Sequence, residues 1–152
     1  MHLAIRRHPD PVLRAVCTPV ASFDAGLRAL ADAMLAAMYA APGRGLAGPQ
    51  VGETRRLFVV DVTWKEGAPD PQVFVNPEIT WASDVIETAE EGCLSIPDMP
   101  CRVPRPAEIA LRWQDLEGVW QEGRFDGAAA RCIQHEADHL NGVLCIDYEA
   151  PL

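Results

Sequence analysis

Two histidines four residues apart, with a glutamate directly after the first, stand in the segment HEADH at 135–139. On a helix, residues i and i+4 project from the same side, so His135 and His139 could direct imidazole nitrogens at one metal ion. Glu136 could then reach a water on that ion, which is the HExxH arrangement. The motif also arises by chance on polar helix surfaces. The pair alone therefore leaves both interpretations open.

A catalytic metal site of this kind needs a third protein ligand and one open coordination position. No histidine follows the motif, and the short tail offers only Asp147 and Glu149 as ligands, with little room for another helix. Cys93, in the segment EEGCLSIP, is the better candidate, because a thiolate is a strong ligand for borderline metals. Cys132 is the rival, three residues before His135. Three ligands from one short helical stretch would crowd a tetrahedral ion, so we expect Cys132 to be a small buried apolar residue.

Hydrophobic periodicity predicts the elements that must position these residues. A helix is expected over 22–43, capped by Ser22 or Asp24, and a second over 126–140, ended by Asn141-Gly142. The other expected elements are strands at 55–62 and 72–79, the second ended or interrupted by Pro77, short extended runs with prolines over 83–106, a hairpin over 107–125 turning near Glu117-Gly118, and a glycine-rich turn over 43–52.

The order of one helix, several strands and a second helix indicates an α+β fold with antiparallel pieces rather than a doubly wound parallel sheet. With 152 residues, no visible repeat and no internal linker, the chain is long enough for one domain with its own core. We therefore expect a single domain over 1–152.

Composition excludes several classes of protein. The net charge is −9, with 22 acidic and 13 basic residues and no basic cluster, so a nucleic-acid partner is not expected. No apolar run approaches the roughly 20 residues of a membrane span, and the first residues lack a signal-peptide core. The five cysteines are odd in number and scattered, which indicates a reducing compartment rather than a disulfide framework.

Three separate segments resemble the three motifs of the peptide deformylases: GRGLAGPQ at 43–50, EGCLS at 91–95 and QHEADH at 134–139. They stand in the family's order at compatible spacing, and PDPVLR, VPRP and NGVLCIDY extend the resemblance over essentially the whole chain. The resemblance implies an α+β fold with antiparallel or mixed sheets around a central HExxH helix. It also implies removal of the formyl group from the N-terminal formylmethionine of new polypeptides, giving formate and a free amino terminus.

By position, the resemblance makes Cys93, His135 and His139 the metal ligands and Glu136 the general base and acid. It also implies roles for nine more residues: Gln50 and the backbone N–H of Leu94 as donors to the developing oxyanion, Gly45 as a backbone contact to substrate, and Gly43, Arg44, Ala89, Ala128, Arg131 and Cys132 in the substrate pocket, the arginines through their stems. Glu91 and Arg105 could form an ordinary exposed ion pair, but we expect them to orient the Cys93 segment.

The resemblance also implies one divalent metal ion, Fe(II) natively with Zn(II) or Ni(II) as replacements, and nascent N-formylmethionyl chains as substrates. Gly48 stands where the family most often has alanine, which loosens the backbone near Gln50, and the small Ala128 widens the pocket. The chain stops at Leu152, before the helix implicated in ribosome docking in bacterial relatives, so ribosome docking is not carried over. We expect a cytoplasmic bacterial monomer, or an organellar protein if a transit peptide was removed.

Two other functions stay open on the sequence. An amidase or peptidase with altered acyl or side-chain specificity would cleave acetylated or unblocked peptides. A non-catalytic metal- or peptide-binding paralogue would bind a metal and hydrolyse nothing. The presence of both Glu136 and Gln50 argues for an active enzyme.

Overall fold

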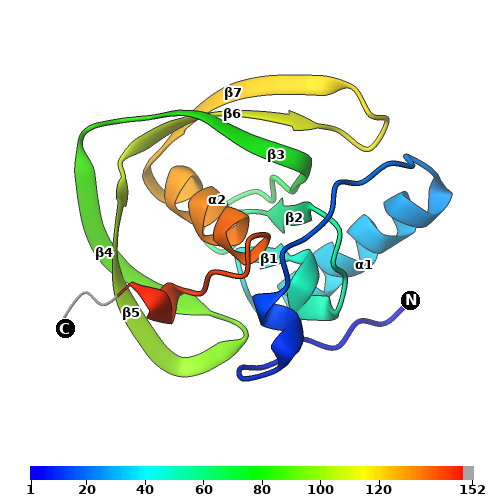
Figure 1. Cartoon of the computed structure of the whole chain (residues 1–152), viewed down its shortest axis with the longest axis horizontal. Helices are drawn as coiled ribbons and strands as arrows, with labels where there is room; N and C mark the ends of the chain where they lie inside the picture. The colour runs from blue at the N-terminus through cyan, green and yellow to red at the C-terminus, as the bar shows by residue number, and fades with distance from the viewer. Residues whose placement is uncertain (149–152) are drawn as a thin grey trace.

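The computed structural model describes residues 1–148, whose strands form two sheets that pack around one central helix, α2 (Figure 1). Within these residues, a five-stranded antiparallel sheet has the order β1 (Gly45–Ala47), β2 (Leu57–Val60), β3 (Gln72–Ala82), β6 (Glu108–Gln114), β7 (Trp120–Asp126), and β4 (Ile86–Cys93) pairs with β5 (Ile96–Pro106) in a second sheet. The helices are α1 (Ala25–Ala40) and α2 (Gly127–His139), with 3-10 turns at Pro11–Arg14, Gly48–Val51 and Cys145–Asp147.

Both predicted helices are confirmed, with shorter ends. Of the two predicted caps of α1, Asp24 is the one used, since its carboxylate accepts the backbone N–H of Leu27 at 2.9 Å. Helix α2 follows Asp126 directly, and Gly142 after it has a φ of +73°, which suits a glycine beyond a helix end. Among residues 1–148, the structure contains no helix with both the length and the apolar character that a membrane span requires.

Two predictions about the strands were wrong. Residues 83–106 form a single long hairpin, β4–β5, rather than short extended runs. Strand β5 accommodates its prolines because, within the described residues, it pairs with β4 alone, so a missing N–H can lie on the unpaired side. The segment 43–52 is likewise not just a turn, since it contains strand β1 and the 3-10 turn Gly48–Val51.

The other three strand predictions were close. The strand expected over 55–62 is β2, with shorter ends. The hairpin over 107–125 is confirmed as β6 and β7, and Gly118 in its turn has a φ of +83°. Pro77 interrupts β3 rather than ending it: the register with β6 shifts between Val75 and Glu78, and Asn76 has a φ of +48°. The strand then continues to Ala82.

Helix α2 buries both an apolar and a polar face. Ile133 packs in one core cluster with Phe58 and Phe74, whose ring centroids are 5.2 Å apart. His135 and His139, on the same helix, are also buried, at 7% and 1% exposure. A helix covered on several sides by sheets can remove polar side chains from bulk water, and this places the HExxH segment in the interior.

Asp61 fixes the segment that leads into the site. It follows β2, is 1% exposed, and accepts hydrogen bonds from the Tyr39 hydroxyl at 2.6 Å and the Asp70 backbone N–H at 3.0 Å. Trp64, in the loop closed by these bonds, donates its indole N–H to the Gly43 carbonyl at 2.9 Å. Burial raises the pKa of Asp61, but these and neighbouring hydrogen bonds outweigh it and hold the pKa below its ordinary value.

We predict that Asp61→Asn lowers the free energy of unfolding of the metal-free protein by about 1–3 kcal/mol near neutral pH. Because the folded-state pKa of Asp61 is lowered, its contribution is present above the unfolded pKa of about 3.9 and is lost as pH falls toward the folded value. Urea unfolding from about pH 7 to about pH 3 should show the difference between variant and wild type shrinking. Asp32→Asn, at an exposed position, is the control, and a pH-independent difference for Asp61→Asn would contradict the account.

Candidate metal centre and active site

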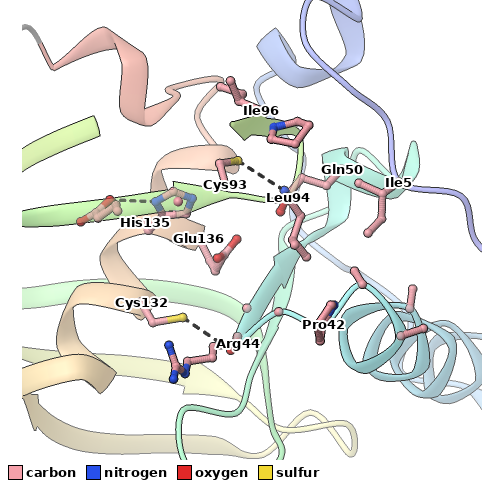
Figure 2. Close-up of a pocket in the computed structure, with 18 of the residues that line it drawn as sticks. Ile5, Pro42, Arg44, Gln50, Cys93, Leu94, Ile96, Cys132, His135 and Glu136 are labelled. Carbon is pink, nitrogen blue, oxygen red and sulfur yellow. Dashed lines mark hydrogen bonds and ion pairs between the residues drawn. The ribbon is translucent and has the colours of Figure 1, made fainter. Parts of the chain in front are cut away.

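The donor atoms of Cys93, His135 and His139 lie within 4.8 Å of one another, and all three side chains are buried. Cys93 ends strand β4 and lies beside His135 of α2 (Figure 2). His139 stands one turn further along α2, so the three donors come from the β4–β5 hairpin and from the central helix. Cys93 Sγ lies 3.5 Å from His139 Nε2. Two such ligands on one tetrahedral zinc ion would be about 3.6 Å apart, so the spacing fits a single metal ion.

The alternative third ligands lie elsewhere. Cys132 is half-buried and its Sγ contacts the Arg44 carbonyl at 3.6 Å, outside the group of three donors. Asp147 forms an ion pair with Arg14 at 2.6 Å. Glu149 lies outside the described residues. Of the ligands that the sequence left open, Cys93 is therefore the one that the fold places with the histidines.

Glu91 orients the first histidine. Its Oε1 lies 2.8 Å from His135 Nδ1, which leaves His135 Nε2 free for a metal. Arg105 forms a two-pronged ion pair with the same carboxylate, at 2.6 and 2.9 Å. Burial raises the pKa of Glu91, but the hydrogen bonds from Arg105 and His135 outweigh it and lower the pKa to about 2. Glu91 is therefore an anion that holds the imidazole ring.

The protonation of the two histidines differs. Burial, together with the positive charges of His135 and Arg105, lowers the pKa of His139 to about 3, so its ring is in the neutral form that binds metals. Burial also disfavours the charged form of His135, but its hydrogen bonds to Cys93 and Glu91 outweigh this and raise its pKa. A divalent cation would displace a proton held between a thiol and an imidazole, so the donor chemistry fits a metal ion.

Glu136 faces the groove beside this cluster (Figure 2). It is 4% exposed, and its Oε1 has no hydrogen-bond partner among residues 1–148. Burial raises its pKa to about 7. An unpartnered buried carboxylate oxygen is costly, which marks a position where a water or a substrate group completes the site.

Gln50 is held in one orientation from both ends of its amide. Its Oε1 accepts the Ala47 backbone N–H at 2.9 Å, and its Nε2 lies 3.1 Å from Ser95 Oγ and 3.7 Å from Cys93 Sγ. The amide donor therefore points toward Cys93, one of the three clustered donor residues. Ser95 is a contact that was not predicted, although it is the last residue of the EGCLS segment.

A side chain at Gly45 would displace groups of α2. A Cβ built there would lie 2.5 Å from Glu136 Oε2 and 2.7 Å from Cys132 Sγ. A Cβ built at Gly43 would likewise be too close to a neighbour, at 2.6 Å from Leu94 Cδ1. These glycines allow strand β1 and the residues just before it to lie directly beside Glu136, Cys132 and Leu94.

Gly48 lies in a close backbone contact. It is buried, and a Cβ there would lie 2.7 Å from the Glu53 carbonyl oxygen. The Glu53 N–H in turn donates to the Gly48 carbonyl at 2.9 Å. This contact surrounds the residue two positions before Gln50, and the looser backbone expected from glycine there stays a prediction.

A groove with a cavity volume of about 1200 Å³ opens beside the cluster. Of the predicted pocket residues, Gly43, Arg44, Ala128, Arg131 and Cys132 line it and Ala89 does not. The groove also has walls that no motif indicated, because they come from the N-terminal segment, from α1 and the residues just after it, and from β5. They include Ile5, Ala33, Ala37, Pro42, Ile96 and Met99.

Comparison with known proteins identifies the family. The sequence model described as polypeptide deformylase matches residues 2–152. The chain belongs to the peptide deformylase family. It is 51% identical over 144 residues to the peptide deformylase of Mesorhizobium japonicum (strain LMG 29417 / CECT 9101 / MAFF 303099), covering 95% of this chain and 82% of the relative. The crystal structure of peptide deformylase from Thermotoga maritima matches with a TM-score of 0.93 and 43% identity, covering 99% of each chain.

Family membership confirms the predicted fold and activity. A relative from Rhizobium meliloti (strain 1021), also named peptide deformylase, is 52% identical over 95% of this chain and 83% of its own length. The chain is accordingly an enzyme of the class that removes the N-formyl group from nascent polypeptides, a metal-dependent amide hydrolysis. The buried Cys93 side chain and the two imidazoles described above are the group of residues 1–148 that could hold such a metal.

We predict that Gly45→Ala lowers kcat/KM for a formylmethionyl peptide by at least about tenfold, because the new methyl group displaces the Glu136 carboxylate. Gly67→Ala is the matched control, since its Cβ would meet the Thr63 carbonyl oxygen at an ordinary 3.7 Å. Formate release and circular dichroism on both variants check the prediction. Unchanged activity of Gly45→Ala would show that Glu136 does not need its position against β1.

Proposed function

We propose that Cys93, His135 and His139 bind one divalent metal ion and that Glu136 is the general base and acid in hydrolysis of N-formylmethionyl peptides. The observation that carries this proposal is the clustering of three buried donor atoms beside the unpartnered Glu136 carboxylate, at the wall of a large groove. When bound, the metal would supply Lewis-acid chemistry and activation of a water. Fe(II) is the proposed native ion, with Zn(II) and Ni(II) as replacements suited to one thiolate and two imidazoles.

Glu136 moves the proton in this proposal. Its carboxylate accepts a proton from the attacking water while a C–O bond forms at the formyl carbon. It then gives that proton to the amine nitrogen as the C–N bond breaks, which leaves formate and a free amino terminus. The close contact between Glu136 and Gly45 keeps the carboxylate at the groove and away from other partners.

Gln50 and Leu94 are the proposed donors to the negative charge that develops on the formyl oxygen. The Gln50 amide is preorganised for this, because Ala47 and Ser95 hold it from either side with its Nε2 toward Cys93. The backbone N–H of Leu94 directly follows Cys93 in the chain. Fixed donors need no reorganisation when charge develops, which is why they lower the barrier.

Gly45 is the proposed backbone contact for the peptide. The Arg44 carbonyl accepts the Asp61 N–H at 2.8 Å, and the antiparallel register continues with Gly45 opposite Val60. Backbone groups alternate along a strand, so the N–H and C=O of Gly45 point away from β2, toward the edge of the sheet that β1 forms within residues 1–148. An extended substrate could pair with these groups.

The proposed pocket for the methionine side chain is formed by Ala128, Cys132 and the aliphatic stem of Arg131. Ala128 is small, so the pocket has room for side chains other than methionine. We further propose that the chain acts as one domain and as a monomer on nascent chains in a bacterial cytoplasm. The bacterial sources of its relatives and the location of the groove and the metal ligands on one chain support this.

We predict that Glu136→Ala lowers the rate of formate release from formyl-Met-Ala-Ser by about 10²–10⁴-fold while the bound metal is retained. The proteins should be purified anaerobically and their metal quantified, with the acetyl analogue assayed in parallel. Glu90→Ala is the matched control, because Glu90 is an exposed carboxylate at the same groove and has no role in the proposal.

The alternative functions predict different results. If the wild-type chain carries one equivalent of metal but releases no formate from the formyl peptide, the proposal is contradicted. Cleavage of the acetyl peptide instead would identify an altered-substrate hydrolase, and cleavage of neither would identify a binding protein. If Glu136→Ala and Glu90→Ala lower the rate of formate release by the same factor, Glu136 is not the general base.

A further inference from the structure

The proposed metal site is assembled from two parts of the fold that no shared sheet connects. Cys93 lies on β4, which within residues 1–148 pairs with β5 alone. His135 and His139 lie on α2, which follows β7 of the five-stranded sheet. Backbone pairing therefore does not fix the distance between the thiolate and the imidazoles. Side-chain contacts between α2 and the β4–β5 hairpin must do so.

Arg131 supplies such contacts from the helix side. Its Nη1 donates to Glu91 Oε2 at 2.6 Å and to the Val103 carbonyl at 2.9 Å. Its Nη2 donates to the Glu87 carbonyl at 2.7 Å. Because Glu87 and Glu91 belong to β4 and Val103 to β5, one guanidinium links α2 to both strands of the hairpin.

Glu91, which accepts the shortest hydrogen bond from Arg131, also orients the proposed metal ligand His135. Glu91 holds Arg131 through Oε2 and His135 Nδ1 through Oε1. Arg131 and His135 are four residues apart on α2, so they project from the same side of the helix. Arg105 reaches the same carboxylate from β5 and also binds Asp138 on α2 at 2.9 Å. The Glu91 side chain is 5% exposed, so its charge depends on both guanidinium groups.

We propose that Arg131 is a positioning residue that clamps the β4–β5 hairpin to α2 and thereby sets the separation between Cys93 and the two histidines. This inference rests on the proposed metal ligands, and it gives the guanidinium a role distinct from the pocket contact of the aliphatic stem. A lysine cannot replace it fully, because a single ammonium lacks the planar fork that meets three acceptors on two strands.

The test measures Zn(II) affinity by competition with a chromophoric chelator. We predict that Arg131→Met, which keeps an aliphatic stem in the groove, weakens Zn(II) binding by about 10–100-fold. Arg131→Lys should show a smaller loss. Arg124→Met is the matched control, because it also removes a guanidinium from an ion pair, at 2.8 Å to Glu108 on the exposed face of the other sheet, and it should stay within about twofold of wild type.

A second readout separates positioning from a general loss of structure. In the metal-free protein, Arg131→Met should speed hydrogen exchange of amides in residues 86–106 and leave β6 and β7 as in wild type. The ratio of kcat/KM for formyl-Met and formyl-Ala peptides should not change. If Arg131→Met fails to fold, the Zn(II) affinity and the exchange of Arg131→Lys give the same test.

Wild-type Zn(II) affinity in both Arg131 variants would overturn the inference. So would a changed ratio between formyl-Met and formyl-Ala peptides at unchanged affinity, which would assign Arg131 to side-chain selection. Failure of the wild-type chain to release formate would contradict the proposed function instead, and the Zn(II) measurement would still decide the role of Arg131.

Discussion

The site depends on one buried carboxylate. Glu91 is 7% exposed, and its oxygens meet Arg105, Arg131 and the Nδ1 of His135 at 2.6 to 2.9 Å. A charge in such a place is unfavourable unless it is fully hydrogen-bonded, so the carboxylate requires all three partners at once. Because those partners come from α2 and β5 while Glu91 lies on β4, satisfying this charge brings the helix and the hairpin together beside Cys93.

The sheets leave room for a substrate because they do not close on each other. Strand β1 is at one edge of the five-stranded sheet within residues 1–148, and glycines at 43 and 45 bring its backbone against Leu94 and Glu136. Larger residues there would fill the groove or displace the carboxylate. The same close packing that buries the HExxH face of α2 thus produces both the reactive cluster and an edge for an extended peptide.

Local signals in the sequence predict both α-helices and the chemistry of the HExxH segment. Asp24 caps α1, and the i, i+4 spacing of HExxH is a property of any helix, so both could be read without a structure. The hairpin β4–β5 could not, because its prolines argue against strands unless the pairing partner is known. The contacts that surround the proposed metal ligands, such as those of Arg131 with Glu87 and Val103, join residues far apart in the chain. No regular spacing in the sequence marks such pairs, so they could not be predicted.

X-ray absorption spectroscopy on the protein loaded with one equivalent of Zn(II) would test the central claim most directly. A site made of Cys93, His135 and His139 predicts one sulfur scatterer at about 2.3 Å and two imidazole nitrogens at about 2.0–2.1 Å, with one further light ligand. The sulfur scatterer should vanish in Cys93→Ser. A wild-type spectrum with nitrogen and oxygen ligands alone would contradict the account.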